Sequence, residues 1–149
     1  RLWDDTRTEA IEMGNVIHHA LSQIKTLEDV PTVLEQLNTA GDFPKENKKE
    51  IEQKIRAVVE HPKLSSYFSS NGEVLNEQEI LMPNGLTLRP DRISIHGDQA
   101  ILIDYKTGKP SPAHKEQIMQ YADVLKDMGY QIKHAIIVYI DQQIELVFA

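Results

Sequence analysis

Residues 89–108 read RPDRISIHGDQAILIDYKTG, and this stretch decides the fold that we expect. Two strand-like runs flank a glycine–aspartate pair at 97–98, where the glycine supplies the positive φ that a two-residue hairpin loop requires. In that register Asp91 faces Asp104 across the two strands. Because side chains alternate between the faces of a strand, Lys106 shares the face of Asp104. The stretch therefore predicts two carboxylates and an ammonium group on one face of a hairpin.

Paired carboxylates of this kind have two interpretations. Neighbouring carboxylates repel each other, and a divalent cation between them removes the repulsion, so Asp91 and Asp104 would supply oxygen ligands for Mg²⁺ or Mn²⁺. Lys106 would then stabilise charge that develops on a phosphate, or orient a water molecule. The alternative is an ion pair on a solvated strand. Apolar residues continue the same face, and a buried charge needs a partner, which favours the metal site.

The composition limits which chemistry is available. The 149 residues include 40% hydrophobic and 26% charged residues, as expected for one globular domain. No apolar run approaches the roughly 18 residues of a membrane span, so we expect no membrane partner. The chain has no cysteine, which excludes thiolate zinc sites, iron–sulfur clusters and thiol nucleophiles and suits a cytoplasmic location. A metal would be held by oxygen and imidazole ligands.

The net charge of −7 argues against a free-standing nucleic-acid-binding protein, because such proteins usually expose a basic surface. It does not argue against a metal site that acts on phosphates, because carboxylate ligands are part of the negative count. The chain begins at Arg1 without methionine and shows no signal peptide. We expect residues 1–149 to form a single domain excised from a larger polypeptide.

Periodicity predicts a mixed α/β fold. Apolar residues at helical spacing predict helices over about residues 8–24, 30–38, 45–61 and 113–128. Strand patterns predict an antiparallel meander of three strands, at 74–82, 86–95 and 100–106, with two-residue turns at 84–85 and 97–98. Further strands are expected at 135–140 and 144–148. The helix before residue 135 permits a right-handed crossover, and hence a parallel pair in a mixed sheet flanked by helices.

Residues outside the hairpin add candidates for the same site. His18 lies on the flank of the apolar face of the first helix, whereas His19 turns towards solvent. A flanking histidine is more often structural than a ligand, and both interpretations stay open. Gln117 and Tyr121 share a helix face four residues apart, where they would contact phosphates, order the lysine or simply pack. Glu79 is expected roughly opposite Pro90, and this register leaves the direction of its side chain relative to Asp91 undetermined.

The ordered set of these residues resembles the PD-(D/E)XK nuclease superfamily, specifically the RecB-type nuclease domain found at the end of AddA-like and RecB-like helicase–nucleases. The matching segments are GNVIH at 14–18, Glu79, RPDRI at 89–93, IDYKTG at 103–108 and QIMQY at 117–121. They span most of the chain. DYKTG alone is a modest signal, whereas the ordered set is specific. The resemblance implies a restriction-endonuclease-like α/β fold.

The resemblance also implies roles for the individual residues. The implied metal ligands are His18, Asp91, Asp104 and the backbone carbonyl of Tyr105, and the implied catalytic lysine is Lys106. Gln117 and Tyr121 match a trailing Q-x-x-x-Y motif that contacts DNA or supports the site, and Glu79 matches a family glutamate of secondary importance. Without cysteines the chain resembles the branch that lacks an iron–sulfur cluster. Arg89-Pro90 replaces a glycine-containing segment common in the family, which puts the local backbone in doubt.

The expected function is therefore a Mg²⁺- or Mn²⁺-dependent DNA nuclease. It would act as an exonuclease on single strands delivered by helicase motor domains of the same polypeptide, in DNA end processing or recombinational repair, with a second helicase–nuclease subunit as a further partner. One alternative is an inactive nuclease-like module that binds nucleic acid or another protein. Another is a metal-dependent hydrolase of a different substrate, for which the sequence offers no distinct binding signature.

Overall fold

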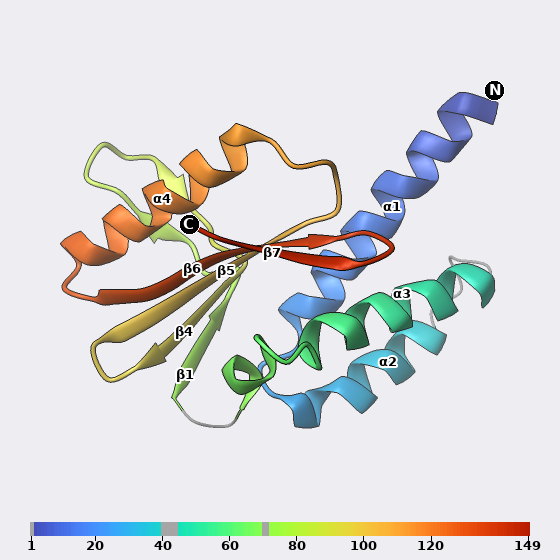
Figure 1. The fold of residues 1–149 in the computed structure, drawn as a ribbon, viewed down its shortest axis with the longest axis horizontal. Helices are drawn as coiled ribbons and strands as arrows, with labels where there is room; N and C mark the ends of the chain where they lie inside the picture. Colours follow the sequence, from blue (N-terminus) through green and yellow to red (C-terminus); the bar gives the residue numbers. More distant parts are fainter. Residues whose placement is uncertain (1, 40–44, 70–71) are drawn as a thin grey trace. The chain divides into compact units, whose positions relative to one another are not determined.

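The computed structural model describes residues 2–39, 45–69 and 72–149, and the chain divides into two compact units, Arg1–Phe68 and Ser69–Ala149. The first unit is helical (Figure 1). Its elements are α1 (Leu2–Ser22), a 3₁₀ helix (Leu27–Asp29), α2 (Val30–Thr39), α3 (Lys45–Val59) and a second 3₁₀ helix (Ser65–Phe68). The predicted helices are all present, and α1 begins earlier than the apolar pattern indicated. None of the helices formed by the described residues combines the length and apolar composition needed to cross a membrane.

The second unit is a five-stranded sheet in the order β1-β4-β5-β6-β7, with α4 against one face (Figure 1). The strands are β1 (Glu73–Asn76), β4 (Arg92–His96), β5 (Gln99–Lys106), β6 (Gln131–Ile140) and β7 (Ile144–Phe148), and the helix is α4 (Pro112–Asp127). The pair β5–β6 is parallel because α4 carries the chain back across the sheet, and the other neighbours are antiparallel. This is the mixed α/β sheet that the sequence predicts.

The β4–β5 hairpin has the predicted register. Ile95 pairs with Ala100 and Ile93 with Leu102, and Gly97 has the positive φ of 64° that the tight turn requires. Alternation then places Ile93 and Leu102 in the core beneath α4. Tyr105 belongs to the opposite face and is also buried, as expected for a central strand covered on both sides.

The long strands predicted at 74–82 and 86–95 are each divided in two. Their outer parts form a separate ladder of β2 (Ile80–Leu81) and β3 (Thr87–Leu88), while β1 and β4 remain in the main sheet. The division falls at Glu77, which adopts a left-handed φ of 50°, and at Pro90, which has no N–H to donate to a ladder. The predicted three-stranded antiparallel meander is therefore present as β1-β4-β5, but its first two strands are shorter than predicted because they are interrupted at these residues.

The turn between β2 and β3 also differs from the prediction. Ile80 pairs with Leu88, and Met82 donates its N–H to the Leu86 carbonyl at 2.8 Å, so the loop contains three residues, 83–85, in place of two. Gly85 supplies the positive φ of 84° at the third loop position. The longer loop shifts the partner of every residue in the preceding strand by one position.

Candidate active site

Asp91 and Asp104 lie side by side where the β4–β5 ladder ends. Asp91 directly precedes β4, and its N–H donates to Oδ1 of Asp104 at 3.2 Å. The carboxylate of Asp91 in turn accepts the N–H of Tyr105 at 2.8 Å. Asp104 is only 3% exposed, and Asp91 is half-buried. The hairpin therefore concentrates two carboxylates at the edge of the core, as its register predicts.

Lys106 lies two residues after Asp104 in β5, on the same face of the strand. Its Nζ lies 3.4 Å from Oδ2 of Asp104 and donates to Oε1 of Gln117 at 2.8 Å. Gln117 is available because α4 begins at a defined point, with Ser111 Oγ accepting the N–H of Ala113 at 3.3 Å. The amide therefore fixes the ammonium beside the carboxylates, and the predicted ordering of the lysine by Gln117 is present in the structure.

Tyr121, one turn further along α4, is buried near the same carboxylates. Burial and the negative charges of Asp104 and Asp91 raise the pKa of its hydroxyl to about 12. The hydroxyl therefore stays protonated at neutral pH and can act as a hydrogen-bond donor. Gln117 and Tyr121 thus lie near the end of β5 that carries Asp104 and Lys106. Their proposed contact with DNA stays a prediction.

His114 and Tyr139 also belong to this region, and the sequence did not single them out. His114 Nδ1 lies 2.9 Å from the Tyr139 hydroxyl oxygen, and Tyr139 is paired with Lys106 in the β5–β6 ladder. Burial and the positive charge of Lys106 lower the pKa of His114, and the charge of Asp104 opposes them. A signal was present, because His114 lies three residues before Gln117 and therefore on the same helix face.

Glu79 does not face Asp91. It is exposed and precedes β2, and the three-residue loop places it one position away from the pairing with Pro90 that the sequence suggested. Glu77 takes the place beside Asp91, because its N–H donates to the Asp91 carbonyl at 3.1 Å. Its side chain is half-buried. In the observed register Glu77 stands opposite Asp91, whereas a two-residue loop at 84–85 would place Gln78 there.

His18 lies in α1 of the first unit and is half-buried, whereas His19 is exposed, as the helical pattern predicts. Nδ1 of His18 lies 3.0 Å from the Gly14 carbonyl oxygen. A proton on Nδ1 makes this a hydrogen bond and gives Nε2 the lone pair, which is the arrangement common among histidines that bind metals. That His18 joins the carboxylates as a ligand stays a prediction about the arrangement of the two units.

The donor set of the second unit suits a hard divalent cation. Asp104 is buried, and carboxylate and carbonyl oxygens are the ligands that Mg²⁺ and Mn²⁺ prefer. Within residues 2–39, 45–69 and 72–149, no group of three or more His, Cys, Asp or Glu side chains gathers into a complete site. The carboxylates of Asp91 and Asp104 are therefore a partial set, which fits Mg²⁺ because this ion usually keeps several water ligands. That the Tyr105 carbonyl is a further ligand stays a prediction.

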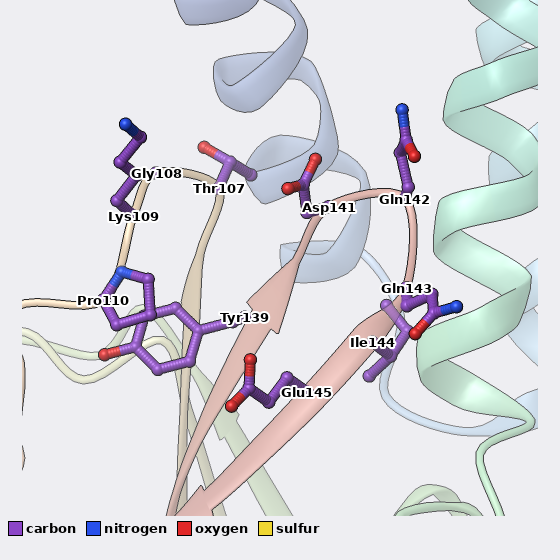
Figure 2. Close-up of a pocket in the computed structure, with 10 residues that line it drawn as sticks. All are labelled: Thr107, Gly108, Lys109, Pro110, Tyr139, Asp141, Gln142, Gln143, Ile144 and Glu145. Carbon is purple, nitrogen blue, oxygen red and sulfur yellow. The ribbon is translucent and has the colours of Figure 1, made fainter.

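A pocket of about 780 Å³ opens beside the end of β5. One side is formed by residues 107–110, which follow Lys106, and the other by Tyr139 and residues 141–145 of the β6–β7 hairpin (Figure 2). Most of these side chains are polar. Tyr139 belongs both to this pocket and to the surroundings of Lys106, so the pocket adjoins the carboxylate–lysine cluster.

The second unit thus combines a mixed α/β sheet with paired aspartates, a lysine two residues after the second aspartate and a supporting helix. A model of the PD-(D/E)XK nuclease superfamily matches residues 1–146, and the chain belongs to this superfamily. Proteins of the superfamily are generally nucleases that use Mg²⁺ or another divalent metal. A comparison with curated proteins gives no match.

Proposed function

We propose that the protein is a Mg²⁺- or Mn²⁺-dependent deoxyribonuclease that hydrolyses phosphodiester bonds in DNA. The observation that carries this proposal is the reciprocal contact of Asp91 and Asp104, with Lys106 held beside Asp104 by Gln117. Family membership supplies the reaction class, and these contacts supply the groups that the reaction needs.

The residues divide the chemistry among them. Asp91, Asp104 and the Tyr105 carbonyl, with His18, would hold the metal, which when bound supplies Lewis acidity and neutralises phosphate charge. Lys106 orients the attacking water or stabilises the negative charge that develops on the phosphate. Water attacks phosphorus directly while the bond from phosphorus to one sugar oxygen breaks and that oxygen takes up a proton, so no covalent intermediate with the protein is required.

Helix α4 supports the site through Gln117 and Tyr121. Gln117 holds the Lys106 ammonium at 2.8 Å and so reduces the number of positions that its flexible side chain can adopt. Tyr121 keeps its proton because of the raised pKa, and therefore offers a donor and never a phenolate to the approaching phosphate. Both residues act by positioning and hydrogen bonding, since neither is a general base at neutral pH.

The finer role that we propose is exonucleolytic trimming of single strands during DNA end processing or recombinational repair. The ordered segments at 14–18, 89–93, 103–108 and 117–121 resemble RecB-type domains, and the absence of cysteine agrees with their cluster-free branch. Helicase motor domains on the same polypeptide, and a second helicase–nuclease subunit, are the partners that this role implies. A DNA-delivering motor would also compensate for the acidic net charge of −7.

The test is cleavage of end-labelled single- and double-stranded DNA by the full-length protein with Mn²⁺ or Mg²⁺. Asp104→Asn and Lys106→Met should each lower the rate by at least about 100-fold, because each removes a group that acts on the transition state. Asp98→Asn, at the exposed turn at the opposite end of β5, is the matched control and should keep the rate. Full metal-dependent cleavage by either site variant would refute the proposal.

A second candidate is a nuclease-like module that binds nucleic acid or a protein without cleaving. The net charge and the partial ligand set among the described residues favour it. Isothermal titration with Mn²⁺ separates the two, because a non-catalytic module should bind no ion at a specific site. Saturable Mn²⁺ binding that Asp104→Asn abolishes would exclude this alternative.

A further inference from the structure

The pocket beside β5 lies one step across the sheet from the lysine of the proposed site. Lys106 pairs with Tyr139 in the β5–β6 ladder, and Tyr139 pairs with Glu145 in the β6–β7 ladder. Residues paired across neighbouring strands face the same side of a sheet, so these three side chains form one row. Since adjacent strands lie about 4.8 Å apart, the row spans roughly 10 Å from Lys106 to Glu145. A nucleotide attached to a phosphate at Lys106 can reach across that span.

The lining does not suit a phosphate as the principal ligand. Among the described residues that line the pocket, Asp141 and Glu145 are acidic, Lys109 is the one cation, and Gln142 and Gln143 are amides. Two carboxylates against one ammonium repel a phosphate. Carboxylates and amide oxygens instead accept hydrogen bonds from the amino groups on base edges. The chemistry is therefore that of a base-binding pocket.

The geometry of the wall supports the same conclusion. Tyr139 is held in place by the contact of its hydroxyl oxygen with His114 Nδ1 at 2.9 Å, and it is only 6% exposed. On the same side of the pocket as Tyr139, Asp141 and Glu145 are exposed, and Figure 2 shows both among the side chains around the opening. A volume of about 780 Å³ is ample for a single base. The pocket thus combines a rigid side with exposed hydrogen-bond acceptors.

We propose that this pocket receives the base of a nucleotide next to the scissile phosphate and favours bases that carry an exocyclic amino group over thymine. Adenine, cytosine and guanine each have such a group, which Glu145 or Asp141 accepts, whereas thymine has none. The inference rests on the proposed nuclease function. It adds a base preference that the carboxylate–lysine cluster alone does not provide.

The experiment is the digestion of a single-stranded DNA pool, random around the cleavage position, by the full-length protein with Mn²⁺, followed by sequencing of the product ends. Thymine should be roughly fivefold under-represented at one of the two positions that flank the cut. Glu145→Gln and Asp141→Asn should make the base frequencies nearly equal, because each replaces an acceptor by a group that also donates. Asp98→Asn should keep the wild-type preference.

A matched pair of substrates isolates the amino group. Hypoxanthine in place of guanine at the preferred position removes only the 2-amino group and should slow cleavage about as much as thymine does. Metal-dependent cleavage with no base preference at either flanking position, or an unchanged preference in both carboxylate variants, would overturn this inference and leave the nuclease function intact. Absence of metal-dependent cleavage for every substrate would overturn both.

Discussion

Asp104→Asn separates metal binding from folding. The Asp104 side chain is 5% exposed, its Oδ1 accepts the Asp91 N–H at 3.2 Å, and its Oδ2 lies 3.4 Å from Lys106 Nζ. Asparagine has almost the same shape and keeps an oxygen for the N–H, but it removes the negative charge. The variant should therefore fold and fail as a ligand.

Without metal, two effects on stability oppose each other in this variant. Loss of the ion pair with Lys106, whose side chain is 23% exposed, costs about 1 kcal/mol, and loss of the repulsion from Asp91 returns a similar amount. A change of 1 kcal/mol moves the melting temperature by about 2–4 °C in a chain of this size. We therefore expect the metal-free melting temperatures of wild type and variant to agree within about 4 °C.

With metal, the two proteins should differ clearly. An ion that binds only the folded state stabilises it by about 2.7 kcal/mol at 100 times its dissociation constant, which corresponds to roughly 5–11 °C. Thermal unfolding, followed by circular dichroism during a Mn²⁺ titration, should show this rise for wild type and for Asp98→Asn and none for Asp104→Asn. An equal rise in Asp104→Asn, or no rise in wild type, would refute the proposed metal site.

Two further predictions concern α4. Gln117→Leu should lower metal-dependent cleavage roughly tenfold, because it removes the amide oxygen that accepts a hydrogen bond from Lys106. The rise in melting temperature that Mn²⁺ causes should not change, because Gln117 is not a metal ligand. Unaltered cleavage kinetics would contradict this role. The pKa of His114 is lowered in the folded state, so His114 binds a proton more readily in the unfolded chain. The contribution of His114 to the free energy of unfolding should therefore be constant above about pH 6.5 and decrease as the pH falls below it. Thermal unfolding without metal across this pH range should show a less steep decrease for His114→Gln than for wild type. Identical slopes in wild type and His114→Gln would exclude His114 as a source of the pH dependence.

The features that sequence predicted correctly depend on short-range geometry. The turn at 97–98 fixes the pairing of Asp91 with Asp104, because a two-residue loop leaves one register for the strands on either side. Helical spacing likewise predicted the shared face of Gln117 and Tyr121 and the different exposure of the two adjacent histidines in α1. In each case the information lies within about twenty residues of chain.

The features that sequence missed depend on a single residue of loop length or on contacts between distant strands. The loop before β3 was expected to contain two residues and contains three, so the residue opposite Asp91 is Glu77 and not its neighbour Gln78. Tyr139 enters the neighbourhood of Lys106 only through the parallel β5–β6 register, which a turn does not set. Nothing in the local pattern identifies that pairing.

The contacts between Asp91, Asp104 and Tyr105 have a consequence for mutagenesis and for the evolution of this end of the sheet. Beyond the last backbone pair, carboxylate oxygens accept the main-chain N–H groups of Asp91 and Tyr105. The side chains that would bind the metal thus also continue the hydrogen bonding of the hairpin. Alanine at either aspartate would remove the carboxylate that accepts a part-buried N–H, so loss of activity in an alanine variant would mix a weakened hairpin with lost chemistry. Selection for a stable hairpin alone would favour aspartate or asparagine at these positions, even in a relative that no longer cleaves.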